Sequence, residues 1–214
     1  MTNCWSWPSA PWSRFPKEAV DPDLPLVQAL QAGDDSALNT LIERHREPLF
    51  RFVFRFLREE TAARDVVQET FVRVYFKVGK FLPRSTAKTW FYAIALNLCR
   101  DHVRGLARRR GEVSLDAPAT EMQPGFEPAE PRPGPSEQAV ESDRFGRLQS
   151  AIDRLPHKLK SAIILCSLEG MSHQEAAEIL ETTPKTIELR IYHAKEKMRE
   201  FLEKELESGD RRWT

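Results

Sequence analysis

The sequence predicts an all-α protein with two small helical domains joined by a flexible, acidic linker. Apolar residues recur every three or four positions over residues 26–111 and again over 146–207, which is the period of an amphipathic helix. Between these blocks, residues 112–145 contain few apolar side chains and six prolines from Pro118 to Pro135. Such a segment cannot bury enough surface to offset the entropy lost on ordering. The two helical blocks are therefore expected to fold as separate units.

Length and composition exclude several classes of protein. The chain has 214 residues, 41% of them hydrophobic, which allows one large domain or two small ones. Its longest apolar runs, such as Ala162–Cys166, are far below the ~20 residues that span a bilayer, and no secretory signal opens the sequence. Three widely spaced cysteines (Cys4, Cys99, Cys166) form no disulfide framework and no CxxC metal site. We expect a cytoplasmic protein without membrane insertion.

The net charge of zero hides a strong segregation of charge. Residues 26–111 hold sixteen Lys/Arg and nine Asp/Glu, a net charge of +7, whereas residues 112–145 hold two basic and eight acidic residues, a net charge of −6. Residues 1–25 carry −1, and residues 146–214 hold twelve of each sign. A basic block, an acidic connector and a neutral block indicate distinct partners, and the basic block is a first, weak sign of nucleic-acid binding.

The first domain is expected to begin after a tail. Residues 1–25 contain three Trp and five Pro without a helical or strand period, which predicts a flexible segment. Helical spacing starts at Leu26, and a second helix follows that Asp35 or Ser36 would cap. Residues 49–57 favour another helix, with Arg51 and Arg55 on one stripe. A strand with alternating Phe residues is the competing interpretation.

Two longer amphipathic helices complete the first domain. Residues 61–80 place their valines on one face and polar side chains on another. Pro83 predicts a loop over residues 81–87, and residues 88–110 are helical again, with arginines crowding the far end. Trp90 begins the apolar stripe of this last helix, so we interpret it as a core residue; a base-stacking platform is the alternative.

The second domain contains the most specific local signal. Helices are predicted over 148–155, 157–168, 172–180 and 184–207, with residues 208–214 as a tail. Ser172 and Glu175 have the spacing of a capping box, and Thr183 is placed to cap a helix whose first residue is Pro184. The helices at 172–180 and 184–207, joined by a short turn, have the pattern of a helix-turn-helix. In that motif the second helix enters the major groove of DNA. A helical hairpin that packs on its own domain is the alternative.

No catalytic or metal-binding pattern is present in the sequence. The five histidines lack HxxxH or HExxH spacing, and there is no GxSxG motif and no glycine-rich phosphate loop among only nine glycines. We therefore expect a protein that is not an enzyme and that needs no cofactor and no metal.

Several motifs in order resemble the bacterial RNA polymerase sigma factors of the extracytoplasmic-function (ECF) class. Residues 65–74, DVVQETFVRV, resemble the family's DxVQExF segment, and residues 88–97, KTWFYAIALN, resemble its (K/R)TWLxxIAxN segment, followed by DHVR at 101–104. Residues 155–172 are similar to the entry into the family's promoter-binding helix-turn-helix. The resemblance covers residues 26–110 and 146–202, and it implies a region 2-like helical bundle followed by a region 4-like helix-turn-helix.

The resemblance also implies partners and site residues. The partners would be core RNA polymerase, promoter DNA and an anti-sigma factor. The residues implied for polymerase binding are Asp65, Gln68, Glu69 and Arg73. Those for binding the minus-ten element, where Asn97 and the loop at 82–87 would hold an unstacked base, are Arg84, Ser85, Lys88, Asn97, Arg100, Arg104 and Arg108. Those for the minus-thirty-five element are Lys185, Thr186, Glu188, Leu189, Arg190, His193 and Lys195.

Departures from the family pattern and two alternative functions stay open at this point. Leu82-Pro83-Arg84 replaces the usual Arg-Gly of the loop, and Glu188-Leu189 replaces a Lys/Arg–Ser pair in the recognition helix. The acidic linker is either a solubilising spacer or, by the resemblance, a mimic of nucleic acid that threads the polymerase cleft and RNA exit channel. The alternative functions are a stand-alone helix-turn-helix transcription regulator and a sigma-like protein that sequesters another factor.

Overall fold

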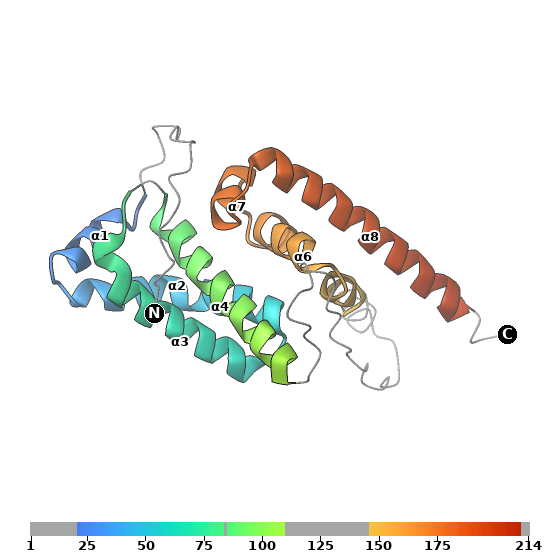
Figure 1. Ribbon diagram of the computed structural model, residues 1–214, viewed down its shortest axis with the longest axis horizontal. Coiled ribbons are helices and arrows are strands. Elements are labelled where there is room, and N and C mark those ends of the chain that lie inside the picture. The colour runs from blue at the N-terminus through green and yellow to red at the C-terminus, as the bar shows by residue number, and fades with distance from the viewer. Residues whose placement is uncertain (1–20, 84, 110–145, 211–214) are drawn as a thin grey trace, which may run out of the picture.

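The computed structural model describes residues 21–83, 85–109 and 146–210, and every element in these ranges is helical (Figure 1). The first domain contains α1 (Leu24–Gln31), α2 (Ser36–Leu57), α3 (Glu60–Lys77), a 3-10 turn η1 (Val78–Lys80) and α4 (Ala87–Arg109). The second contains a helical segment at 146–153, α6 (His157–Ile163), a π-helical turn η2 (Ile164–Leu168), α7 (His173–Ile179) and α8 (Pro184–Asp210). The all-α prediction is confirmed. The predicted linker, 112–145, lies outside the described residues.

The predicted N-terminal tail, residues 1–25, is wrong for its last two residues, because α1 already begins at Leu24. The carboxylate of Asp23, which is buried, lies 2.7 Å from His45 Nε2 and 2.9 Å from Arg44 Nη1 in α2. Asp21 accepts a hydrogen bond of 2.7 Å from the amide of Ala87, at the start of α4. These partners lie far along the chain, so the local sequence pattern could not indicate them.

Helix α2 is continuous over 22 residues and contains Pro48 in its interior. Residues 49–57 are therefore helical, and the strand interpretation is wrong. A proline inside a helix removes one backbone hydrogen bond, and here the surrounding burial compensates. Leu41, Leu49 and Phe52 are fully buried along one stripe of this helix. Tertiary packing thus overrides the local cost of the proline.

The predicted caps of α2 and of the helix-turn-helix differ in their outcome. Asp35 makes no side-chain cap for α2; Asp34 instead accepts hydrogen bonds from the amide and the hydroxyl of Ser36, at 3.0 and 2.5 Å. In the second domain, Ser172 and Glu175 form the predicted capping box. The hydroxyl of Thr183 accepts from the amide of Thr186 at 3.1 Å, as predicted.

Helix α4 is buried on more sides than its sequence stripe predicts. The whole run from Phe91 to Leu96 is buried, whereas a single apolar stripe would bury only the residues of this run that share one face of the helix. Helices α2 and α3 pack against one side of α4, and α7 of the second domain packs against another. Figure 1 shows α4 between these two groups of helices. The two domains therefore share one continuous hydrophobic cluster.

The second domain is held together by α8, the longest described helix. Ile187, Ala194 and Met198 are its buried residues, and α6 and α7 pack against it. The helix continues to Asp210, so the predicted tail at 208–214 is wrong for its first three residues. Residues 211–214 lie outside the described part of the chain.

Candidate nucleic-acid interface

The recognition helix α8 presents one face to the domain core and the other to solvent. Thr183 caps the helix, and Ile187 and Ala194, both fully buried, fix its rotation about its axis. Arg190 is half-buried on the flank. Six side chains on the opposite side are exposed: Lys185, Glu188, Leu189, Tyr192, His193 and Lys195. This is the arrangement that a helix needs to enter the major groove.

Three of the residues predicted for this face already have partners within the helix or its cap. The Nζ of Lys185 lies 2.9 Å from Glu188 Oε2, and this hydrogen bond and charge lower the pKa of the Glu188 carboxyl. The hydroxyl of Thr186 lies 2.8 Å from that of Thr183, which makes Thr186 part of the helix cap. Both ion-pair partners are largely exposed, so DNA can compete for them at little cost.

Sequence reasoning missed Tyr192, which is 60% exposed on the same face as Leu189. Its ring lies edge-on to that of His193, with centroids 5.5 Å apart. Tyr192 follows Leu189 by three positions, so helical spacing alone places the two side chains together. Leu189 and Tyr192 form an apolar patch among charged neighbours, which suits contact with thymine methyl groups.

The basic face of the first domain lies along α4. Arg104 and Arg108 are exposed, and Arg104 lies 3.9 Å from Asp101. Asn97 is half-buried, and its Oδ1 accepts a hydrogen bond of 3.3 Å from Arg100. Burial, and then the charge of Arg104, lower the pKa of Arg100. Cations in such a row can neutralise phosphates and release counterions.

The loop before α4 is anchored at both ends. Gln31 in α1 donates to the carbonyls of Val78 and Phe81, at 2.8 and 3.0 Å. The hydroxyl of Thr86 accepts from the amide of Thr89 and so caps α4. Ser85 is half-buried, Lys88 is half-buried beside the ring of Tyr92, and Arg84 lies outside the described residues. The structure thus holds the loop next to the first turn of α4.

Trp90 packs against aromatic neighbours within its own domain. Its ring centroid lies 4.9 Å from that of Phe81 and 5.6 Å from that of Phe91. The residue is half-buried against the core cluster. This position agrees with the interpretation of Trp90 as a core residue.

The predicted docking face on α3 is exposed, and it continues into an aromatic patch that sequence reasoning missed. Asp65, Gln68 and Glu69 are exposed, and Glu69 lies 2.8 Å from the half-buried Arg73. One and two turns further on, three large hydrophobic residues are exposed on the same helix: Val72, Tyr75 and Phe76, the last by 78%. Exposed apolar residues that cluster in this way indicate a protein interface. The sequence did contain a signal for this patch: Val72 and Phe76 follow Gln68 at steps of four, so two apolar residues lie on a helix face that is otherwise polar.

Within the ranges 21–83, 85–109 and 146–210, no three His, Cys, Asp or Glu side chains gather as a metal site requires. In the same ranges, no helix combines the length and the apolar character that crossing a bilayer requires.

Both helical domains match known protein families. Residues 41–109 match sigma-70 region 2, and residues 145–198 match sigma-70 region 4. The chain is 30% identical to the ECF RNA polymerase sigma-E factor of Haemophilus influenzae over 81% of this chain and 92% of that protein. It is 28% identical to the RNA polymerase sigma-H factor of Pseudomonas aeruginosa, over 81% and 90% of the two chains.

A known structure of similar fold is that of CnrH in complex with the cytosolic domain of CnrY. It matches with a TM-score of 0.62 and 26% identity, over 85% of this chain and 97% of CnrH. The sigma factor RpoE of Bartonella quintana, in complex with the anti-sigma factor NepR, shares the fold at a TM-score of 0.57 and 23% identity, over 77% and 96% of the two chains.

Proposed function

The chain belongs to the ECF-type RNA polymerase sigma factors, with sigma-70 regions 2 and 4, and from this premise we propose how its own residues serve transcription initiation. The family is non-enzymatic. Region 2 would bind core polymerase through α3 and the minus-ten element through α4. Region 4 would bind the minus-thirty-five element through α8. The finding that best supports this division is that each of the three helices exposes a different kind of surface.

The face of α3 has the properties of a protein-docking surface. Gln68 and Glu69 offer hydrogen-bonding groups, while Val72 and Phe76 offer apolar area directly beside them. Interfaces combine an apolar centre with a polar rim in this way. We assign Asp65, Gln68, Glu69 and Arg73 to core polymerase binding and add Val72, Tyr75 and Phe76 to the same surface.

The face of α4 has the properties of a surface for opened DNA. Arg100, Arg104 and Arg108 supply cations at successive turns, and Lys88 supplies another at the start of the helix. Holding an unstacked base requires a polar anchor next to a loop. Asn97 is our candidate for this anchor, and Ser85 and Arg84 belong to the adjacent loop.

The exposed face of α8 carries residues for two roles: placing the helix on the DNA duplex and distinguishing between base pairs. Lys185, Arg190, His193 and Lys195 suit phosphate contacts, which place a helix on the duplex without reading sequence. Glu188 can accept a hydrogen bond from a cytosine amino group, and Leu189 can contact a thymine methyl group. Thr186 acts through the helix cap. Because Glu188 repels phosphates and pairs with Lys185 at 2.9 Å, we expect weak DNA binding by region 4 alone, with binding at the second site strengthened by tethering to polymerase.

Other partners follow from the same proposal. Similarity to CnrH, whose known structure contains the cytosolic domain of CnrY, supports a further protein partner, and we propose an anti-sigma factor. A protein that works with polymerase and promoter DNA is expected in the cytoplasm. The acidic residues 112–145 would lie in the basic cleft and exit channel of the polymerase, where their net charge of −6 mimics nucleic acid.

Run-off transcription tests the proposed function. Purified chain is added to core polymerase and a promoter library, and transcripts are sequenced. A sigma factor gives promoter-specific transcripts with core alone. A stand-alone regulator, the alternative function, would act only when another sigma factor is also present.

A further inference from the structure

Helix α1 precedes residues 41–109, which match sigma-70 region 2, yet it contacts the end of α3 that leads into the loop before α4. In space, α1 packs against α2 and lies beside the turn η1 (Figure 1). The proposed function places the loop before α4 at the minus-ten element. Residues of α1 can therefore act on a DNA-binding loop without being part of it.

Gln31, the last residue of α1, holds the first end of the loop. Its Nε2 donates to the carbonyl oxygen of Val78 at 2.8 Å and to that of Phe81 at 3.0 Å. An amide nitrogen carries two hydrogens, and here one is used at the start of η1 and the other just after its end. The carbonyl of Val78 also accepts from the amide of Phe81 at 2.9 Å. Gln31 thus fixes the point at which the chain leaves η1.

Asp21 holds the second end of the loop. Its Oδ2 accepts a hydrogen bond of 2.7 Å from the backbone amide of Ala87, the fully buried first residue of α4. Amides in the first turn of a helix have no partner within the helix, and this end of a helix favours a negative charge. A hydrogen bond to a carboxylate is also stronger than one between neutral groups. Asp21 therefore fixes where α4 begins.

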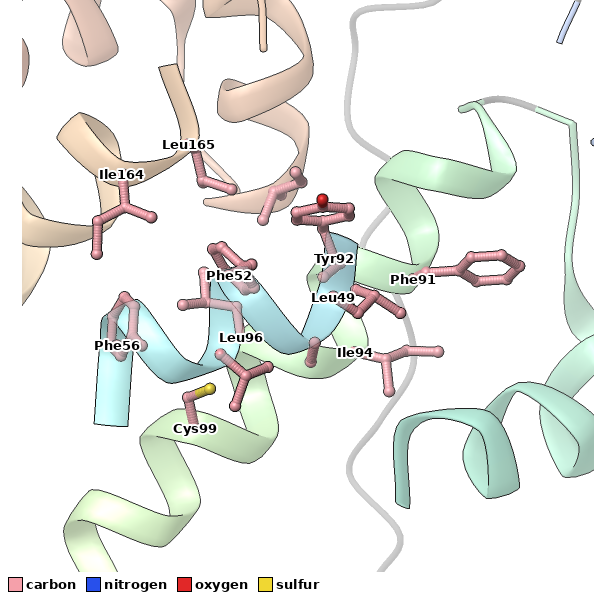
Figure 2. Packing of buried hydrophobic residues seen from close by; sticks show 14 of the residues in the cluster. Leu49, Phe52, Phe56, Phe91, Tyr92, Ile94, Leu96, Cys99, Ile164 and Leu165 are labelled. Carbon is pink, nitrogen blue, oxygen red and sulfur yellow. The ribbon is translucent and has the colours of Figure 1, made fainter. Parts of the chain in front are cut away.

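Asp21 reaches α4 from a fixed position, because Asp23 anchors the same segment to α2. The Oδ1 of Asp21 accepts from the amide of Asp23 at 3.1 Å. The buried carboxylate of Asp23 lies 2.9 Å from Arg44 Nη1 and 2.7 Å from His45 Nε2. The ring of His45 lies edge-on to Phe91 of α4, with centroids 5.0 Å apart. Phe91 is fully buried in the hydrophobic cluster (Figure 2).

Between these two anchors the chain turns towards solvent. Leu82 is 58% exposed and Pro83 is exposed, whereas Phe81 just before them is buried against Trp90. The ring of Pro83 restricts the backbone at its own position. A short segment with fixed ends has few arrangements open to it. The anchors thus decide how the exposed side chains of the loop are presented.

From these contacts we propose that α1 and the segment before it position the loop before α4, and that Gln31 and Asp21 are positioning residues for the choice of a minus-ten base. Neither side chain needs to touch DNA. A loop that is already ordered loses less entropy when it binds. A loop of fixed shape also rejects bases around which a mobile loop could rearrange. The inference rests on the proposed function, because that function places this loop at the minus-ten element.

The experiment changes each anchor in two ways. Gln31→Ala removes the side chain, and Gln31→Glu keeps its size but sets oxygens, which cannot donate, against two carbonyls. Asp21→Ala removes the acceptor for the amide of Ala87, whereas Asp21→Asn keeps an acceptor oxygen and is the rescue variant. The control is Gln28→Ala, because Gln28 is exposed on the same helix.

Each full-length variant is combined with core polymerase and a promoter library that is randomised over the minus-ten element, and the transcripts are sequenced. Permanganate reactivity measures open complexes, and capture of core measures docking. A change that only lowers the amount of folded protein would weaken all promoters to the same degree. Base preference at the minus-ten element therefore separates a positioning role from a structural one.

We expect Gln31→Ala, Gln31→Glu and Asp21→Ala to reduce open complexes roughly three- to tenfold, as one or two lost hydrogen bonds would. The same variants should accept more than one base at a position where the wild type prefers one. Asp21→Asn should recover most of both properties, and Gln28→Ala should match the wild type. Capture of core should not change. Circular dichroism confirms folding, and if a variant of one anchor unfolds, the variants of the other anchor decide.

Three results would overturn the positioning role. The first is folded variants of both anchors with the base preference of the wild type, even if they form fewer open complexes. The second is weaker capture of core, which would assign α1 to polymerase docking. The third is a change in Gln28→Ala as large as that in Gln31→Ala, which would mean that α1 contacts DNA directly. Failure of the proposed function looks different, since the wild type itself would then give no promoter-specific transcripts with core.

Discussion

The hydroxyl of Tyr92 donates a hydrogen bond of 3.1 Å to Glu169, a residue 77 positions later in the chain and in the other domain. Burial, followed by the charge of Glu169, raises the pKa of this tyrosine, so the hydroxyl stays protonated and remains a donor. The side chain of Tyr92 is almost completely buried. The hydrogen bond joins α4 of the first domain to the residue that follows η2 in the second.

The docking face is tested by replacing both of its polar residues. Gln68→Ala with Glu69→Ala should weaken binding to core polymerase by roughly ten- to a hundredfold, which corresponds to one or two lost polar contacts at an interface. Both side chains are exposed, so the helical content should not change. The control pair is Gln28→Ala with Glu43→Ala, which are exposed on α1 and α2. Equal capture of core by both pairs would remove the assignment.

Promoter opening is tested at Asn97. Asn97→Ala should leave core binding intact and reduce open complexes, seen as lost permanganate reactivity near the start site. The change also removes the acceptor for Arg100 at 3.3 Å, so Arg100→Ala is measured beside it. Asn39→Ala, an exposed asparagine of α2, serves as control. Normal opening in Asn97→Ala would assign Asn97 a structural role in α4 instead.

The recognition helix is tested through its acidic residue. Glu188→Lys should change which minus-thirty-five sequences are used, because a hydrogen-bond acceptor becomes a donor. It also frees Lys185 from its 2.9 Å pair. Non-specific binding should therefore rise, with a salt slope steeper by about 1 to 2. Promoter-library transcription at two salt concentrations measures both effects. An unchanged sequence preference would assign Glu188 to the solvated face of the helix.

Arg190, on the same helix, tests whether a residue places α8 on the DNA or reads its sequence. Arg190→Ala should weaken use of all promoters to a similar degree, since phosphate contacts carry no sequence information. The same library measures it. A change of preferred sequence in Arg190→Ala would instead mean that this arginine contacts base edges.

Stability should fall in acid through His157. Burial, and then the charges of Arg100, Lys160 and Arg104, lower the pKa of this imidazole to about 4 from 6.5. Among the described residues, none forms a hydrogen bond with its Nε2. The unfolded chain binds a proton at His157 near pH 6.5, whereas the folded chain does so only near pH 4. The free energy of unfolding is therefore highest above pH 6.5 and falls as the pH is lowered from 6.5 towards 4. At pH 5 the loss is about 2 kcal/mol.

Urea unfolding at pH 7.5 and pH 5 measures this loss. His157→Leu should show a smaller difference between the two pH values than the wild type. His173→Leu, which replaces an exposed histidine, should keep the full difference. Equal pH dependence in His157→Leu and the wild type would show that another group causes the loss.

Helical period and capping residues were sufficient to predict most elements. Ser172 with Glu175, and Thr183 with Pro184, act within four positions of one another, so their geometry follows from sequence alone. The family motifs likewise predicted which helices carry the candidate surfaces. These features are local, and local patterns are visible in a single sequence.

The features that were missed depend on contacts between distant parts of the chain. Asp23 is buried beside Arg44 and His45, which lie 21 and 22 positions further along the chain. Tyr92 is buried between Phe52 of the first domain, with ring centroids 4.9 Å apart, and Glu169 of the second, which accepts its hydrogen bond. Phe76 was overlooked for the opposite reason: a large apolar residue usually belongs to a core, whereas here it is exposed on the face that continues from Gln68.

The central claim is that this chain confers promoter specificity on core polymerase. Its most direct test is run-off transcription from a promoter library with core polymerase alone, the chain alone and both together. We predict promoter-specific transcripts only when both are present, and loss of these transcripts with Gln68→Ala/Glu69→Ala at limiting concentrations. Transcripts that require a second sigma factor, or none from core plus chain on any promoter in the library, would contradict the claim.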